Sequence, residues 1–271
     1  MFKQQLRLLF TAMQFYTRLP IPAWVGWQPE WLTQSARYFS VIGFLVGLIS
    51  AAIWALAMLV LPATVAATLA VIAAVLTTGA FHEDGLADAC DGFGAGGTVE
   101  RILTIMKDSR IGAFGAIGVG LMLLLRIELL ASFPMQLGAV VLVCGHIVSR
   151  TVAITLITRH PYVGLNDRAA DNILSKAKPA IMGLAYRDVY LCWFWAAFLT
   201  LVTIASAGFL QHWLSFVLGL ISASIASWLA GVYFQRRIGG ITGDCLGATQ
   251  QVCECIFTLA LMTCAAFLAK T

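Results

Sequence analysis

Charged residues are scarce in this chain. Aspartate, glutamate, lysine and arginine together make up 11% of its 271 residues, whereas soluble domains average roughly 25%. Hydrophobic residues make up 60%, and the mean hydropathy is +0.88. This composition excludes an ordinary water-soluble fold. Because the apolar residues gather in long runs, we expect a single membrane-embedded domain over residues 1–271.

Other features are missing too, and each absence excludes a class of protein. The net charge of +4 is too small and too dispersed for a nucleic-acid partner. The seven cysteines have no paired spacing, which argues against a disulfide framework. Cys253 and Cys255 form a C-x-C, but no second pair completes a zinc site. No lysine follows a glycine, so the chain has no Walker A phosphate-binding loop.

Seven stretches are long and apolar enough, or nearly so, to cross a bilayer. A spanning helix needs about 20 apolar residues, and these stretches lack the period-two alternation of a β-barrel. We therefore predict an all-α polytopic helical bundle. The predicted spans are Tyr38–Leu61, Thr64–Phe81, Ile111–Leu125, Met135–Ile157, Val189–Leu210, Trp213–Phe234 and Val252–Ala269.

The amino-terminal segment and the basic residues predict how the bundle is oriented. Leu6, Leu9, Phe10 and Met13 follow helical spacing, which predicts an amphipathic helix lying in the membrane interface. With the amino terminus inside, fourteen lysines and arginines fall on the cytoplasmic side and two on the other. Three polar loops, 82–110, 158–188 and 235–251, then lie at the cytoplasmic face, where we expect the chemistry to take place.

Acidic residues cluster immediately after the second predicted span. Four of the thirteen in the chain fall between positions 83 and 91. On a helix Asp84, Asp88 and Asp91 lie within roughly 60° of one another, and carboxylates so close repel unless a cation lies between them. Mg²⁺ suits such ligands, since substrate phosphates complete its coordination. We predict that Glu83, Asp84, Asp88 and Asp91 bind a metal, because a solvated helix end explains only one or two of these acids.

Two further motifs lie on the same predicted side of the membrane. Lys107 and Arg110 are one helical turn apart and suit the binding of phosphate oxygens, with a simple positive-inside anchor as the alternative. Asp108, between them, is a candidate metal ligand or base. Asp244 lies between glycines in Gly243-Asp-Cys-Leu-Gly247 and is a second candidate site residue.

Ionisable residues also occur within and beside the fourth predicted span. His146 and Arg150 are four residues apart, and ionisable residues at that depth usually face the bundle interior. They either bind substrate or pair internally with Glu128 or the backbone. The following loop carries Arg159-His160, Asp167-Arg168 and Lys176 to Lys178, which either contact a large anionic substrate or form a solvated basic loop.

Three of these motifs together resemble one enzyme family. They are His82-Glu-Asp-Gly-Leu-Ala-Asp-Ala-Cys-Asp-Gly92, Ile105-Met-Lys-Asp-Ser-Arg-Ile-Gly112 and Gly243-Asp-Cys-Leu-Gly-Ala248. Their order and spacing resemble the cobalamin (5′-phosphate) synthase family, also called adenosylcobinamide-GDP ribazoletransferase. Phe15-Tyr-Thr-Arg-Leu-Pro20 is similar to that family's opening motif, which adds Arg18 as a candidate substrate-binding residue.

The resemblance implies an integral enzyme of the bacterial inner membrane, active in the last stage of vitamin B12 assembly. A hydroxyl of α-ribazole, or of its 5′-phosphate, would attack the corrinoid-side phosphate of adenosylcobinamide-GDP and release GMP, with Mg²⁺ as the expected cofactor. Lys107 and Arg110 would hold the diphosphate, with Arg18, His146 and Arg150 as further substrate-binding candidates. Asp244 or Asp108 would accept the hydroxyl proton. A homo-oligomer is compatible with the sequence.

Three rival interpretations fit less well. The CDP-alcohol phosphotransferases share D-x-x-D-G, but Gly96 replaces the arginine of their motif and their later carboxylate pair is absent. Membrane polyprenyl transferases commonly carry two aspartate-rich motifs, whereas this chain has one and the lone Asp244. A transporter would show internal repeats and charges near the membrane midplane. Here the acids cluster at one face instead.

Overall fold

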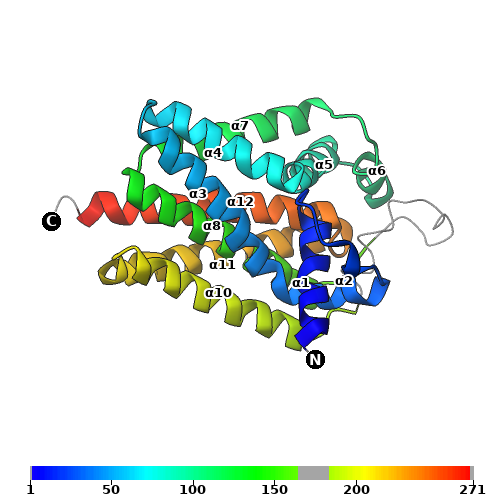
Figure 1. Cartoon of the computed structure of the whole chain (residues 1–271). Helices are drawn as coiled ribbons and strands as arrows, with labels where there is room; N and C mark the ends of the chain where they lie inside the picture. Colours follow the sequence, from blue (N-terminus) through cyan, green and yellow to red (C-terminus); the bar gives the residue numbers. More distant parts are fainter. Residues whose placement is uncertain (1, 164–182, 269–271) are drawn as a thin grey trace.

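The computed structural model describes residues 2–163 and 183–268, and these fold almost entirely into helices (Figure 1). The longer helices are α1 (Phe2–Tyr16), α3 (Phe39–Met58), α4 (Ala63–Thr78), α5 (Phe81–Ala95), α7 (Ala113–Ala131), α8 (Met135–Thr155), α10 (Tyr186–Ser206), α11 (Trp213–Ile238) and α12 (Gly243–Leu268). Two short α-helices are α2 (Pro29–Ser35) and α6 (Val99–Ile105). Short 3₁₀ turns are η1 (Ala23–Val25), η2 (Ala36–Tyr38), η3 (Leu156–Thr158) and η6 (Leu210–His212).

The predicted membrane bundle is confirmed. Among the described residues, six helices are long and apolar enough to cross a bilayer, namely α3 together with α2, α7, α8, α10, α11 and α12. A seventh candidate is the pair α4 and α5, which are bent by 91° against each other. The count of seven spans predicted from the sequence therefore agrees with the structure when the bent pair α4 and α5 is counted as one span.

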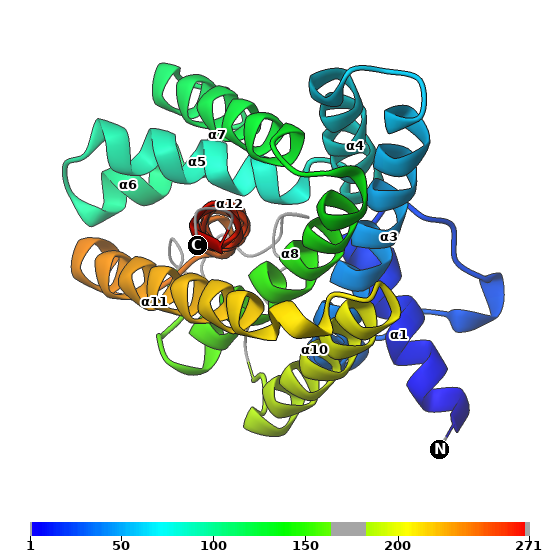
Figure 2. The same ribbon diagram turned by 90° about the vertical axis from the view of Figure 1, so that its left-hand side faces the viewer.

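Helix α8 forms the centre of the bundle. It is the most buried of the six spans and packs against α3, α10, α11 and α12. Figure 2 shows α12 end-on, with α5 and α7 on one side and α8 and α11 on the other. The outer helices expose large apolar side chains, such as Leu121 on α7, Phe198 on α10 and Ile225 on α11. Those faces suit contact with lipid.

The two ends of the bundle differ. At one end the connections are short, covering residues 59–62, 132–134 and 207–212. The opposite end carries α1, α2, α5, α6 and the turn at 239–242 (Figure 1), and we call it the polar end. Helix α1 lies across this end and buries Leu8, Ala12 and Tyr16. The predicted amino-terminal helix is thus confirmed, although Leu6, Leu9, Phe10 and Met13, which were expected to form its apolar face, are only partly buried.

Two expected loops are largely helical. Helices α5 and α6 occupy most of 82–110. Helix α12 begins at Gly243, well before the predicted start at Val252, because the Thr242 hydroxyl accepts a hydrogen bond from the Cys245 amide at 3.2 Å and caps the helix. The polar side chains between 244 and 251 lower the local hydropathy, so a search for apolar runs does not detect the first turns of α12. Asp244 consequently lies in a first helical turn rather than in a loop.

Candidate active site

Helix α5 owes its direction to a sharp bend after α4. Gly79 adopts the left-handed conformation, with φ +69°, and ends α4, and Ala80 follows with φ +59°. The Arg18 amide donates to the Thr77 carbonyl at 2.8 Å, and the Arg18 side chain lies where a Cβ on Gly79 would be. The exposed Arg18 is therefore placed at the start of α5, which is bent by 91° from α4 and runs across the polar end.

Two glycines bring the acidic helix against α12. A Cβ built on Gly85 would lie 3.1 Å from the Asp244 Cα, and one built on Gly247 would lie 3.2 Å from the Gly85 Cα. Such distances leave no room for side chains, so the backbones of α5 and α12 touch. Asp244 is thereby brought beside the α5 carboxylates, although more than 150 residues separate them in sequence.

Asp84, Asp88 and Asp244 form an acidic patch at this crossing. Asp84 is exposed, whereas Asp88 and Asp244 are partly buried. Asp88 interacts electrostatically with Asp244, Asp84 and Asp91, and the interaction with Asp244 is the strongest of the three. Asp244 also interacts electrostatically with Asp84 and Lys107. Negative charge is therefore concentrated at the crossing of α5 and α12. Of the four metal ligands predicted from the sequence, Asp84 and Asp88 belong to this patch.

Asp91 has partners of a different kind. One of its carboxylate oxygens accepts from the Gly112 amide at 2.7 Å and the other from the Gly115 amide at 2.8 Å. The carboxylate thus caps the amino terminus of α7, where unpaired amides and the helix dipole favour negative charge. Each oxygen retains a lone pair, but the buried Asp91 already has a structural function.

Glu83 points away from the acidic patch into the bundle. It is 8% exposed, and its Oε1 accepts from Arg126 at 3.1 Å and from Gln251 at 2.9 Å. Because successive helical positions turn by about 100°, Glu83 and Asp84 face different surroundings. The structure therefore separates Glu83 from the other predicted metal ligands.

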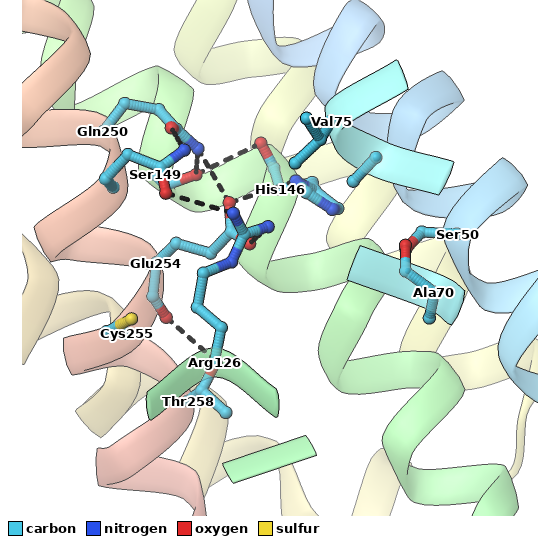
Figure 3. Close-up of polar contacts among 12 residues, drawn as sticks. Ser50, Ala70, Val75, Arg126, His146, Ser149, Gln250, Glu254, Cys255 and Thr258 are labelled. Carbon is cyan, nitrogen blue, oxygen red and sulfur yellow. Dashed lines mark hydrogen bonds and ion pairs between the residues drawn. The ribbon is translucent and has the colours of Figure 1, made fainter. Parts of the chain in front are cut away.

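Glu83 belongs to a buried polar network between α5, α7, α8 and α12. Arg126 also donates to Glu254 Oε1 at 2.6 Å. The other Glu254 oxygen accepts from Gln250 at 2.7 Å and lies 3.1 Å from His146 Nδ1. Figure 3 shows Glu254 between Arg126 and His146. Ion pairs therefore lie buried in the interior of the membrane bundle.

His146 and Arg150 also belong to this network. Each is 2% exposed, and Arg150 Nη1 donates to the His146 carbonyl at 3.1 Å. Of the internal partners expected from the sequence, the backbone is confirmed. Glu128 instead is exposed, and Glu254 supplies the carboxylate. The sequence did not identify Arg126, Gln250 and Gln251 as members of this network, because the helices that it joins are distant in sequence.

Lys107, Asp108 and Arg110 lie at the polar end between α6 and α7. Arg110 binds Asp108 with two nitrogens, at 2.6 Å and 3.0 Å, and remains largely exposed. This contact lowers the pKa of Asp108 to about 2. Lys107 is exposed and interacts electrostatically with Asp244. The predicted phosphate-binding residues are therefore accessible, and Lys107 adjoins the acidic patch.

No set of three His, Cys, Asp or Glu side chains in the described residues is already arranged to hold a metal ion. The oxygen ligands nevertheless suit Mg²⁺, which usually binds through one or two carboxylates and takes its remaining ligands from water and substrate phosphates. Asp84 and Asp88 are the two carboxylates without a structural partner in the cluster. The carboxylates of Asp244, Asp84 and Asp91 all interact electrostatically with Asp88, and a cation bound there would relieve the repulsion among them.

His82, next to Glu83, is a buried residue that the sequence analysis did not single out as a site residue. It is 2% exposed and neither ring nitrogen has a hydrogen-bond partner in the described part of the chain. Its ring stacks on Phe39 and lines a cavity of about 50 Å³ with Tyr16 and Gly243.

Four charged residues of the loop after α8 were also candidates for contact with an anionic substrate. These residues, Asp167, Arg168, Lys176 and Lys178, lie outside the described residues.

Almost the whole chain is similar to one family of known proteins. The family model described as cobalamin-5-phosphate synthase matches residues 8–262. The chain belongs to this family. The match covers all four motifs on which the resemblance rests, so the family assignment made from the sequence is confirmed.

Relatives within the cobalamin-5-phosphate synthase family are similar over almost their whole length. A protein of Shewanella frigidimarina named adenosylcobinamide-GDP ribazoletransferase is 44% identical over 96% of this chain and 95% of its own. A protein of the same name from Ralstonia pickettii is 44% identical over 96% of both chains. One from Shewanella piezotolerans is 41% identical over the same shares. No solved structure matches the chain.

Proposed function

We propose that this chain is a Mg²⁺-dependent adenosylcobinamide-GDP ribazoletransferase of the bacterial inner membrane. The names of its relatives support the activity. The observation that carries the proposal is the meeting of Asp84, Asp88 and Asp244 beside Lys107 at the polar end. The excess of basic residues predicted at that end supports a site facing the cytoplasm.

The proposed reaction transfers a phosphate-linked group without a separate activation step. An oxygen of α-ribazole, or of its 5′-phosphate, forms a bond to the corrinoid-side phosphorus of adenosylcobinamide-GDP. The bond from that phosphorus to the bridging oxygen breaks, and GMP leaves with the electron pair. The hydroxyl proton passes to a base. Because the donor is already a diphosphate, catalysis consists mainly of positioning and charge stabilisation.

Fewer residues would bind the metal ion than the sequence suggested. Asp84 and Asp88 would hold Mg²⁺, whereas Glu83 is engaged by Arg126 and Asp91 caps α7. When bound, Mg²⁺ would neutralise the diphosphate and the charge that develops on the leaving GMP. The two carboxylates lie on a helix that crosses the bundle end, where a soluble nucleotide has access.

The other residues position the substrates and move the proton. Lys107 and Arg110 bind diphosphate oxygens from the exposed side of the acidic patch. Asp244 accepts the acceptor's hydroxyl proton, because Arg110 lowers the pKa of the alternative base, Asp108, to about 2 and so weakens it as a proton acceptor near neutral pH. Arg18, at the α4–α5 bend, contacts the anionic substrate.

His146 and Arg150 are not part of the proposed substrate site. Both are buried, and their partners within the network are Glu254 and the backbone. A substrate reaching them would have to break these contacts inside the membrane, where a charge left without a partner is costly.

The test is GMP release by purified protein supplied with adenosylcobinamide-GDP, α-ribazole and Mg²⁺. We expect GMP only when both substrates are present and expect EDTA to abolish it, with added Mg²⁺ restoring it. A folded preparation that releases no GMP with any divalent metal would refute the proposal. Substrate flux into proteoliposomes without product formation would instead support a transporter.

A further inference from the structure

Helices α10 and α11 follow each other in the chain but hardly pack together. They meet at the η6 turn, and each packs on α8. From the turn the two helices diverge toward the polar end, as both views show (Figures 1 and 2). A wedge-shaped crevice is left between them, with α8 as its floor.

The crevice has an apolar part and a polar part that share Trp193. The apolar part has a volume of about 260 Å³ and is lined by residues such as Val148, Ala197, Phe216 and Leu220. The second part, about 160 Å³, is lined by Thr155, Arg159, His160, Ser224, Ser227 and Trp228. From Trp213 to Trp228 the crevice follows α11 for about 22 Å at 1.5 Å per residue. That length exceeds the thickness of one leaflet, which is roughly 15 Å.

Within a bilayer the apolar part must be filled by something other than water. Water needs two or more polar partners in a cavity, and this lining supplies almost none. An empty space would forfeit the contacts of every side chain that lines it. A lipid acyl chain satisfies the lining and is present at high concentration around the outer faces of α10 and α11.

The polar part indicates the charge of the lipid. The Trp193 indole donates to Thr155 at 3.1 Å, the Ser227 hydroxyl to the Val152 carbonyl at 2.9 Å, and His160 lies 3.2 Å from Gln235. Arg159, by contrast, is exposed and has no side-chain partner within residues 2–163 and 183–268. A guanidinium at the end of an apolar crevice is complementary to a phosphate with an acyl chain attached.

We propose that the crevice between α10 and α11 binds one anionic phospholipid from the bilayer. Its acyl chain lies along α8 between Phe216 and Trp193, and its phosphate binds Arg159. This site is separate from the acidic patch on α5 and α12. The proposal therefore stands independently of the transferase activity.

Native mass spectrometry of the full-length protein tests the proposal. The purified protein is titrated with phosphatidylglycerol or with phosphatidylcholine carrying identical acyl chains. We expect one tightly retained phosphatidylglycerol per chain, with a preference over phosphatidylcholine of about fivefold. Arg159→Gln should abolish that preference. Arg187→Gln removes an exposed cation near the amino terminus of α10 and should leave the preference for phosphatidylglycerol unchanged.

A second pair of variants tests the apolar part. Ala197→Phe fills the crevice and should prevent retention of both lipids, whereas Ala52→Phe, on the exposed face of α3, should not. Retention of phosphatidylglycerol by Arg159→Gln at the wild-type level would overturn the proposal. So would a dimer whose contact covers α10 and α11, because a second copy would then occupy the crevice.

Discussion

The backbones of Gly85 and Gly247 touch where α5 crosses α12. A Cβ on Gly247 would lie 3.2 Å from the Gly85 Cα and equally close to the His82 carbonyl oxygen. This contact places Asp244 beside Asp84 and Asp88. Neither glycine is required by its backbone conformation, since both have ordinary negative φ values. They are needed for the close approach itself.

Substituting either glycine should therefore impair catalysis more than folding. Gly85→Ala and Gly247→Ala would force the two backbones apart by a few tenths of an ångström, and a misplacement on this scale is expected to lower kcat about tenfold. Gly120→Ala is the matched control, because nothing lies within 4 Å of the added methyl group. Wild-type kcat in both crossing variants would show that the contact does not position the site.

Removing the charge of one predicted metal ligand should abolish turnover. Asp88→Asn is expected to lower kcat at least about 100-fold, because the carboxylate that would hold Mg²⁺ becomes neutral. Glu100→Gln, an exposed acid on α6, should retain wild-type GMP release. Circular dichroism and gel filtration establish that both variants fold. Asp88→Asn with full activity would remove Asp88 from the metal site.

The two candidate bases should differ in the kinetic constant that they affect. Asp244→Asn is expected to lower kcat by about 10²–10⁴-fold, the range of general-base catalysis. Asp108→Asn removes the bidentate contact that holds the Arg110 guanidinium in place, and should mainly raise the KM for adenosylcobinamide-GDP because Arg110 is then no longer oriented toward the diphosphate. Steady-state GMP release measures both constants. A large kcat loss in Asp108→Asn, with Asp244→Asn unaffected, would reverse the assignment.

Asp91 should act on the stability of α7. Asn in its place offers one acceptor oxygen where two amides, of Gly112 and Gly115, are bound. We expect Asp91→Asn to lower the free energy of unfolding by about 1 kcal/mol and to leave the half-saturating Mg²⁺ concentration unchanged. Thermal unfolding and Mg²⁺ titration of activity check the two parts. A large rise in the Mg²⁺ requirement would identify Asp91 as a ligand.

The sequence predicted the spans and the gathering of polar residues at one end because these depend on local hydropathy. It also placed Asp84, Asp88 and Asp91 on one helix face correctly, since that follows from helical geometry. The partners of Asp91 and Glu83 could not be predicted. They are determined by the left-handed residues Gly79 and Ala80, which turn α5 across the bundle, and by contacts with residues far away in sequence.

The same reason explains why the sequence did not identify Arg126 as a member of the buried polar network. Arg126 directly follows the predicted span Ile111–Leu125, whereas in the fold it lies between Glu83 and Glu254. Two arginines, Arg126 and Arg150, balance these two glutamates in the network. A hydropathy pattern records the presence of a charge but carries no information about its partner on another helix.

That balance predicts the effect of removing one charge. Arg126→Met leaves two buried carboxylates with one arginine, and breaking such a pair typically costs 3–5 kcal/mol. We expect a correspondingly large drop in thermal stability in detergent. Arg187→Gln, an exposed arginine on α10, should change stability by less than about 1 kcal/mol.

The double variant Glu83→Gln/Arg126→Met distinguishes lost charge balance from lost packing. Arg126→Met leaves the carboxylate of Glu83 without its arginine partner, and Glu83→Gln removes that unpaired negative charge. Gln251 can still donate a hydrogen bond to the amide oxygen of the new side chain. The double variant should therefore be more stable than Arg126→Met alone. If the two unfold at the same temperature, the arginine stabilises the bundle by its volume and the charges of the network are incidental. If the double variant recovers stability but not kcat, Glu83 also holds α5 in the position that brings Asp84 to Asp244.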